Sequence, residues 1–154
     1  MSQTFLNDLA LLLLRLSGLG MALAHGYGKV VALAAGEGGG FIAGVESLGF
    51  PLPGLFAWAA ALAEFLGGLC VALGLGTRVA AASAGFAMFV AAFVRHHALQ
   101  HLLVAVGAMQ ASEETVRSWG NPELALLYLL AFGTLVLTGG GRLSLDRVLP
   151  GRRR

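Results

Sequence analysis

The chain has 154 residues, of which 57% are hydrophobic and only 12% are charged, and its mean hydropathy is +0.80. Soluble domains carry about 25% charged residues, so this composition excludes a soluble nucleic-acid-binding domain, a disordered tail and a secreted disulfide scaffold. The single cysteine, Cys70, excludes an internal disulfide, a dithiol redox centre and a metal site built from cysteines. The natural environment of such a chain is a lipid bilayer.

Four stretches are long and apolar enough to be membrane spans, because a spanning helix needs about 20 largely apolar residues. They lie near residues 9–27, 55–75, 78–98 and 123–138. Backbone at membrane depth must be helical or part of a closed barrel, and none of the four stretches alternates as a barrel strand does. The sequence therefore predicts an all-α integral membrane protein, a four-helix bundle in a single domain.

The connections between the predicted spans are short or polar. Residues 36–53 are rich in glycine and leave room for a short interfacial helix around residues 41–48. The tight turn at residues 74–77 predicts an antiparallel hairpin of the second and third spans. Whether the third helix continues through residues 96–101 is open, because residues 102–109 are apolar again.

The distribution of charge predicts how the chain is inserted. We expect the first span to be retained rather than cleaved as a signal peptide, since residues 1–10 lack Lys and Arg and Arg15 interrupts the apolar core. Most Lys and Arg side chains near the span ends lie after the second span or after the fourth. Those after the fourth span form a basic tail at residues 142–154. This pattern predicts a multi-pass protein with both termini in the cytoplasm, and the tail suits anionic lipid headgroups.

Arg15 and Glu64 each place a charge inside a predicted span, where a charged residue such as Arg costs about 2.5–3.5 kcal/mol. Both lie on helix faces rich in small residues, which allow helices to approach closely. We therefore predict that the two side chains meet, or share a ligand, inside the bundle. Two interpretations stay open: the pair fixes the helix register without chemistry, or Glu64 handles protons or anchors a ligand, with Arg15, His25 or Lys29 as its partner.

The histidines collect towards the predicted outer ends of the spans. His25 opens the segment His25-Gly26-Tyr27-Gly28-Lys29, whose glycines would allow close approach of a ligand headgroup. His97 and His101 share a helical face, but no carboxylate interleaves them and no cysteine is near, so we expect rings at the headgroup boundary and no metal. Glu123 suits the N-terminus of the fourth helix.

Several pieces of the sequence, taken in order, resemble the DoxX family of small four-helix bacterial membrane proteins. The matching pieces are Arg15-Leu16 with His25–Lys29, Gly49–Pro53, Glu64–Gly68, Gly74–Arg78, and Glu123–Tyr128 with Gly139–Asp146. The resemblance implies a bacterial inner-membrane protein tied to redox metabolism, since family members are associated with a terminal quinol oxidase, thiosulfate:quinone oxidoreduction or thiol-redox proteins. It is weakest over residues 99–117. The family's polar signature falls on Arg15, His25, Lys29, Glu64 and Arg78.

These features together predict a quinone-linked redox accessory subunit of an electron-transfer complex. The expected ligand site lies between the first two spans, with a quinone headgroup near His25, Lys29 and Glu64. Four further polar residues are supporting candidates: Arg78, His97, His101 and Glu123. Electrons would come from other membrane redox subunits, because the sequence has no convincing cofactor site, and we expect no haem.

The alternative is a purely structural or assembly subunit of a larger membrane complex, in which Glu64 does no chemistry. A small transporter or proton path is a third hypothesis. Four short helices leave little room for alternating access, so a transporter would require a homo-oligomer. No hypothesis involves nucleic acid.

Overall fold

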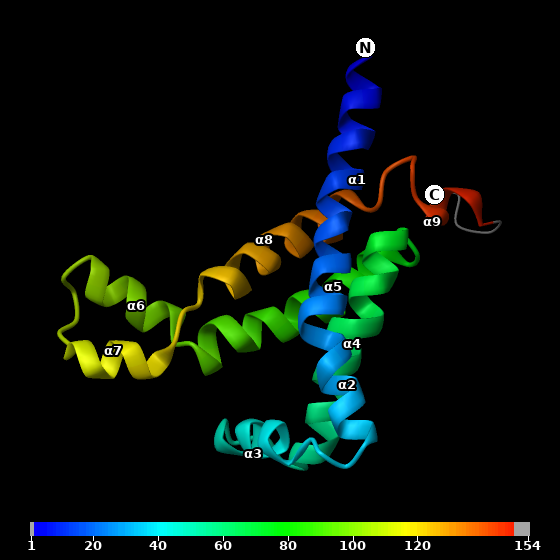
Figure 1. Cartoon of the computed structure of the whole chain (residues 1–154). Helices are drawn as coiled ribbons and strands as arrows, with labels where there is room; N and C mark the ends of the chain where they lie inside the picture. Colours follow the sequence, from blue (N-terminus) through cyan, green and yellow to red (C-terminus); the bar gives the residue numbers. More distant parts are fainter. Residues whose placement is uncertain (1, 150–154) are drawn as a thin grey trace.

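A computed structural model describes residues 2–149, which fold into helices joined by short turns, with no strand among these residues. This confirms the predicted all-α fold. The first helix is long and nearly continuous: α1 (Gln3–Met21), a π-helical segment η1 (Ala22–Gly26) and α2 (Tyr27–Ala34) follow one another without a break. Helix α4 (Pro53–Leu73) runs back along it, and α3 (Gly39–Ser47) lies to one side of the lower end of this pair, against α4 (Figure 1). A short helix therefore occupies the place predicted in the first loop.

The second half of the chain begins at the tight turn after α4. Helix α5 (Thr77–Phe89) continues into the π-helical segment η2 (Val90–Arg95). His97 then takes a left-handed conformation with φ 51°, and the short helix α6 (Ala98–Ala105) starts in a new direction. The open question of a longer third helix is thus answered, because the helix ends at Arg95.

The last helices return along α5. Helix α7 (Glu113–Trp119) lies beside α6 at the far end of the molecule from α1, and α8 (Glu123–Thr138) packs along α5 (Figure 1). A single turn, α9 (Leu145–Val148), follows beside the turn between α4 and α5.

Three helices are long and apolar enough to cross a membrane: residues 3–34, 53–73 and 77–95. A fourth crossing arises if α7 and α8, which are bent by 44° relative to each other, count as one span. By itself α8 has 16 residues and covers the segment predicted for the fourth span. Residues 150–154, the end of the predicted basic tail, lie outside the described residues.

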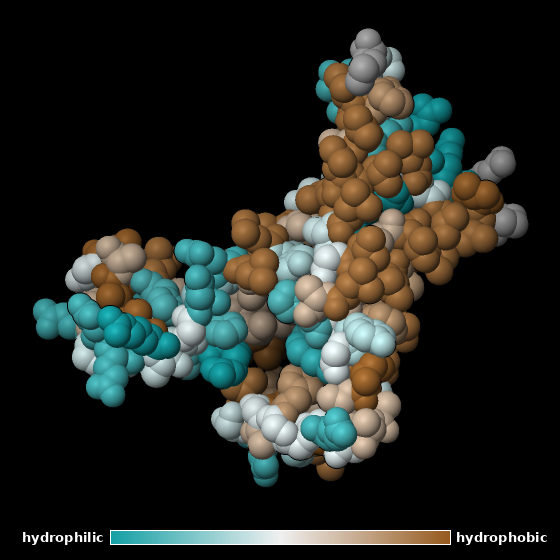
Figure 2. Space-filling view, in the orientation of Figure 1, coloured by the Kyte–Doolittle hydropathy of each residue, from teal (hydrophilic) through white to brown (hydrophobic). Residues whose placement is uncertain are grey.

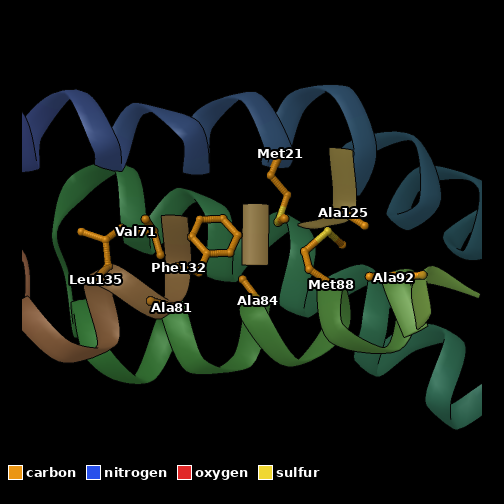
Figure 3. Packing of buried hydrophobic residues seen from close by; sticks show 10 residues of the cluster. Met21, Val71, Ala81, Ala84, Met88, Ala92, Ala125, Phe132 and Leu135 are labelled. Carbon is orange, nitrogen blue, oxygen red and sulfur yellow. The ribbon is translucent and has the colours of Figure 1, made fainter. Parts of the chain in front are cut away.

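The main core lies where α1, α4, α5 and α8 meet. Met21, Val71, Phe132 and Leu135 fill it from three helices, and α5 contributes mainly alanine (Figure 3). Small side chains on α5 let the larger ones of α8 approach its backbone. The surface is also strongly apolar: Leu13 of α1, Phe86 of α5 and Leu130 of α8 are more than half exposed, and hydrophobic residues cover much of the face seen in Figure 2. This pattern fits helices that face lipid.

Helix α4 crosses the first helix at glycines. A Cβ atom on Gly18 would lie 2.5 Å from the backbone oxygen of Gly68, and one on Gly26 would lie 2.5 Å from the backbone nitrogen of Phe65. No side chain fits at either distance, so the two helices are in backbone contact. The predicted close approach of the small-residue faces is confirmed for these glycines.

Candidate functional site

A buried ion pair joins the first helix to α4. The Lys29 ammonium donates to both carboxylate oxygens of Glu64 at 2.6 Å. The Glu64 side chain is 5% exposed and that of Lys29 is 32% exposed. Local structure explains the meeting, because Gly26 lets α4 pass against the backbone at Glu64 and Phe65, and Lys29 lies one turn further along the same helix. The Lys29 ammonium also lies 5.0 Å from the centre of the Phe41 ring.

The predicted pairing of Arg15 with Glu64 is wrong. Arg15 is 1% exposed, but its Nη2 donates to the backbone oxygen of Leu143 at 2.7 Å. Its other terminal nitrogen, Nη1, lies against Gly74 at the end of α4. Gly74 is ten residues from Glu64, which is about 15 Å along a helix, too far for a snorkelling side chain to span. Both charges are buried as predicted, but at opposite ends of the α1–α4 contact.

Arg15 belongs to a polar cluster, the terminal junction, formed by Asp8, Arg15 and Thr77 with residues 141–146. The Asp146 carboxylate accepts from the backbone nitrogens of Gly76 and Thr77 at 2.7 and 2.8 Å and from the Thr77 hydroxyl at 2.7 Å. It thereby caps the N-terminus of α5 from a distant part of the chain and acts electrostatically on Arg15.

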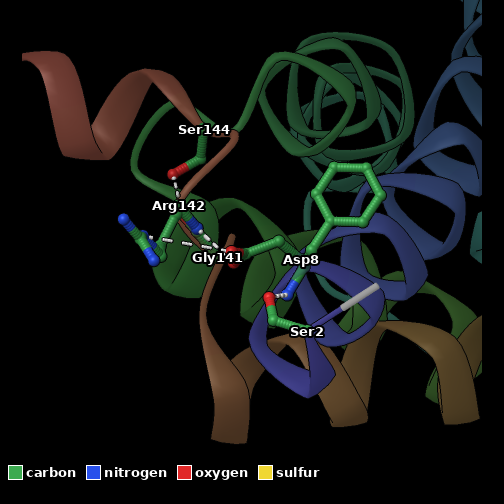
Figure 4. A network of polar contacts seen from close by, with 6 residues as sticks. Ser2, Asp8, Gly141, Arg142 and Ser144 are labelled. Atoms are coloured by element: carbon green, nitrogen blue, oxygen red, sulfur yellow. Dashed lines mark hydrogen bonds and ion pairs between the residues drawn. The ribbon is translucent and has the colours of Figure 1, made fainter.

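Asp8 completes the junction from the start of α1. Its carboxylate accepts from the backbone nitrogen of Arg142 at 2.8 Å, and the Arg142 guanidinium lies 4.0 Å away (Figure 4). The Ser144 hydroxyl, in the same segment, donates to the Gly141 oxygen. The terminal junction therefore ties the segment after α8 to α1, α4 and α5 through groups of this chain alone.

A cavity of about 490 Å³ opens beside the Lys29–Glu64 pair. It lies between α3, α4, α5 and η2, and the hollow between the α3 end and the rest of the molecule is visible in Figure 2. Its wall is mainly apolar, with Phe41, Phe56 and Phe86 among its aromatic residues. Five polar side chains line it, Lys29, Glu64, Ser83, Arg95 and His96, and the Ser83 hydroxyl already donates to the Val79 backbone oxygen. The cavity lies mainly between the second and third spans, whereas the sequence placed the ligand site between the first two.

Arg95 and His96 are polar residues of the cavity that the sequence did not single out as site candidates. Both lie at the end of η2, and π-helical segments occur frequently at functional sites. His96 Nδ1 lies 3.1 Å from the backbone oxygen of Trp119. A carbonyl oxygen only accepts, so Nδ1 carries the proton and Nε2 of the neutral ring is an acceptor. The available signal was the Arg95-His96-His97 cluster at the end of the third apolar stretch.

The other predicted site residues lie elsewhere. His25 is in the π-helical segment η1 and packs edge-on against Tyr128, with ring centres 6.0 Å apart, and it is not among the cavity residues. His101 Nε2 lies 2.8 Å from the Gly120 oxygen, and His97 packs on Trp119. Both therefore hold the end of α7.

Glu123 and Arg78 also have local partners. The Glu123 carboxylate accepts from the side-chain amide of Asn121 at the first turn of α8, as its position suggested. Arg78 donates to the Leu137 backbone oxygen at 3.1 Å. Within residues 2–149, no group of three or more His, Cys, Asp or Glu side chains could hold a metal ion.

A comparison with protein-family models finds DoxX over residues 10–97, more than half of the chain. The chain belongs to the DoxX family. No curated protein and no solved structure matches it. The DoxX region contains every residue that lines the cavity, from Lys29 to His96. The segment after α8 that closes the terminal junction lies beyond it. Family and helices together identify a multi-pass membrane protein.

Proposed function

We propose that this DoxX protein is a quinone-linked redox accessory subunit of a membrane electron-transfer complex, and that the cavity beside Lys29 and Glu64 receives the quinone. The observation that carries the proposal is the nature of that cavity. It encloses about 490 Å³, its wall is mainly apolar, and a few polar groups converge on it. Small-molecule sites typically enclose about 300–1,000 Å³ and combine apolar lining with few polar side chains.

The polar groups suit a quinone headgroup. A quinone presents two carbonyl oxygens, which accept hydrogen bonds. The Lys29 ammonium has three donors, of which two are used on Glu64, so one is available to a ligand. Arg95, which is exposed at the cavity rim, offers a second donor group. Phenylalanine side chains of α3 and α4 would contact the ring and its apolar tail.

Reduction of a quinone to a quinol takes two electrons and two protons. The cavity offers two groups that can relay these protons: the acceptor nitrogen of His96 and the Glu64 carboxylate would each first take up a proton from water and then pass it to the reduced quinone. The electrons come from partner subunits of the complex, and the apolar surface of α1, α5 and α8 offers area for such partners as well as for lipid. In this proposal the chain binds and positions the quinone, and the partner carries the electron donor.

Binding of decylubiquinone to the purified protein in nanodiscs tests the proposal. Ala63 lines the cavity, whereas Ala82 is exposed on α5 and does not. We expect Ala63→Phe to fill the cavity and weaken binding more than ten-fold, and the matched variant Ala82→Phe to bind as the unchanged protein does. Equal affinity of both variants would place any bound quinone on the lipid surface and contradict the proposal.

The variant Glu64→Gln distinguishes the quinone-binding subunit from a purely structural subunit, because it keeps the shape of the side chain and removes its charge. If complexes containing the variant assemble poorly but those that assemble turn over normally, Glu64 serves assembly alone. The quinone proposal predicts normal assembly with reduced quinone affinity and turnover.

A further inference from the structure

A second hollow, of about 660 Å³, lies at the opposite end of the molecule from the Lys29–Glu64 pair. It is formed where α5 begins, α8 ends and α9 follows, and the glycines at 139–141 form one wall. Two candidate spans therefore have their ends here, so the hollow lies where apolar helices give way to polar segments. It shares Thr77, Gly141, Ser144 and Asp146 with the terminal junction but opens outward.

The hollow is lined by more cationic than anionic side chains. Arg78 and Arg147 line it together with the single carboxylate of Asp146. The carboxylate is already engaged by the first turn of α5. Arg78 is positioned by its bond to the Leu137 oxygen through one nitrogen, which leaves further donors of the guanidinium fork for a ligand. Arginine is well suited to phosphate oxygens, because its planar fork can donate two parallel hydrogen bonds.

The most exposed large apolar side chains of residues 2–149 are Leu137 at 78%, Val148 at 76% and Val79 at 72%. Each belongs to the wall of the hollow or is next to a wall residue in the chain, and together they are called its apolar rim. Val79 is itself part of the wall, and the other two are chain neighbours of wall residues Thr138 and Arg147. A free phosphate would gain nothing from such a rim. A ligand with an anionic head and acyl chains would use the cationic hollow and the apolar rim together.

We propose that this hollow binds the headgroup of an anionic phospholipid, with the phosphate between Arg78 and Arg147 and the acyl chains against Val79, Leu137 and Val148. The site is independent of the quinone cavity, and it would anchor the ends of α5 and α8 at the membrane surface. Basic residues near an anionic membrane surface contribute about 1 kcal/mol each, which is about a five-fold change in affinity.

The test is titration of the full-length protein in detergent with dioleoyl phosphatidylglycerol, with bound lipid counted by native mass spectrometry. Dioleoyl phosphatidylcholine and inorganic phosphate form parallel arms. We expect preferential binding of phosphatidylglycerol, weakened about five-fold by Arg147→Gln and by Arg78→Gln. Arg117→Gln, which removes an exposed arginine on α7, is the matched control and should bind normally.

Two further results decide the assignment. Inorganic phosphate that displaces the lipid at similar affinity would make the hollow a phosphate site and overturn the lipid proposal, as would equal binding of the two lipids. A variant with Arg152, Arg153 and Arg154 changed to Gln tests non-specific attraction to the last three arginines, and it should keep the preference for phosphatidylglycerol. Arg147→Gln breaks no side-chain bond within the described residues, so its result does not depend on a change in folding.

Discussion

The two ends of the α1–α4 contact each bury a charged side chain, but they surround it differently. At the terminal junction, Arg15 is sealed between Gly74 and the Leu143 carbonyl. At the cavity, Glu64 meets the Lys29 ammonium and both groups face an open apolar space. The first arrangement connects parts of the chain, and the second offers charged groups to a ligand. The proposal therefore assigns the ligand to the buried charge that borders open space, which is Glu64 and not Arg15.

The largest expected effect tests the cavity end. Lys29→Met leaves the buried Glu64 carboxylate without its cation, and we expect the free energy of unfolding to fall by about 3 kcal/mol. The double variant Lys29→Met/Glu64→Gln removes both charges and should recover most of that loss. The measurement is denaturation by sodium dodecyl sulfate followed by circular dichroism. A double variant as unstable as the single one would contradict the ion-pair account.

The second effect tests the terminal junction. Asp146→Ala removes the carboxylate that caps α5, and we expect unfolding to become easier by about 2–3 kcal/mol. Decylubiquinone affinity should stay unchanged, because Asp146 is far from the cavity. Glu37→Ala, at an exposed loop position, is the control for loss of a carboxylate. A large loss of quinone affinity in Asp146→Ala would show that the two ends are not independent.

The third effect concerns the close crossing of the first helix and α4 at the cavity end. A Cβ at Gly26 would strike the backbone of Phe65, whereas one at Gly28 meets nothing within 4 Å. Gly26→Ala should destabilise the protein by about 1–3 kcal/mol through forced displacement of α4. Gly28→Ala should stabilise it by up to about 1 kcal/mol, because alanine favours helices. Thermal unfolding of the two variants compares them directly, and equal behaviour would rule out the tight crossing.

The smallest effect concerns α7, which is held by histidines. His101→Ala removes the hydrogen bond to the Gly120 oxygen and should cost about 1 kcal/mol. Because the bond is local, we expect faster amide hydrogen exchange in α7 and α6 with little change elsewhere. Gln100→Ala, at the neighbouring position, is the control. Unchanged exchange in α7 would mean that the histidine does not hold it.

The spans and the glycine contacts could be predicted because they depend on local composition. Apolar runs identify α4, α5 and α8, and glycines on one face allow close packing. The sequence offered Arg15, His25 and Lys29 as partners of Glu64 but could not choose between them, because the choice depends on the register of two antiparallel helices. The structure selects Lys29. The contact of Gly26 with Phe65 sets that register and places Glu64 near Lys29 rather than Arg15.

The cavity could not be predicted from the sequence either. It depends on the place where η2 ends and on α3 folding against α4, both long-range features. Arg95 and His96 become site residues only through that arrangement. The partner of Arg15, the Leu143 backbone oxygen, leaves no mark in a sequence pattern, because every residue carries a carbonyl group.

The most direct test of the central claim, that the cavity beside Lys29 and Glu64 holds a quinone, is photolabelling with an azidoquinone in nanodiscs followed by peptide mapping. We predict labelling of α4 and of α5–η2 at residues of the cavity wall, displaced by excess decylubiquinone. Label spread over the exposed faces of α1 and α8, and resistant to displacement, would contradict the account.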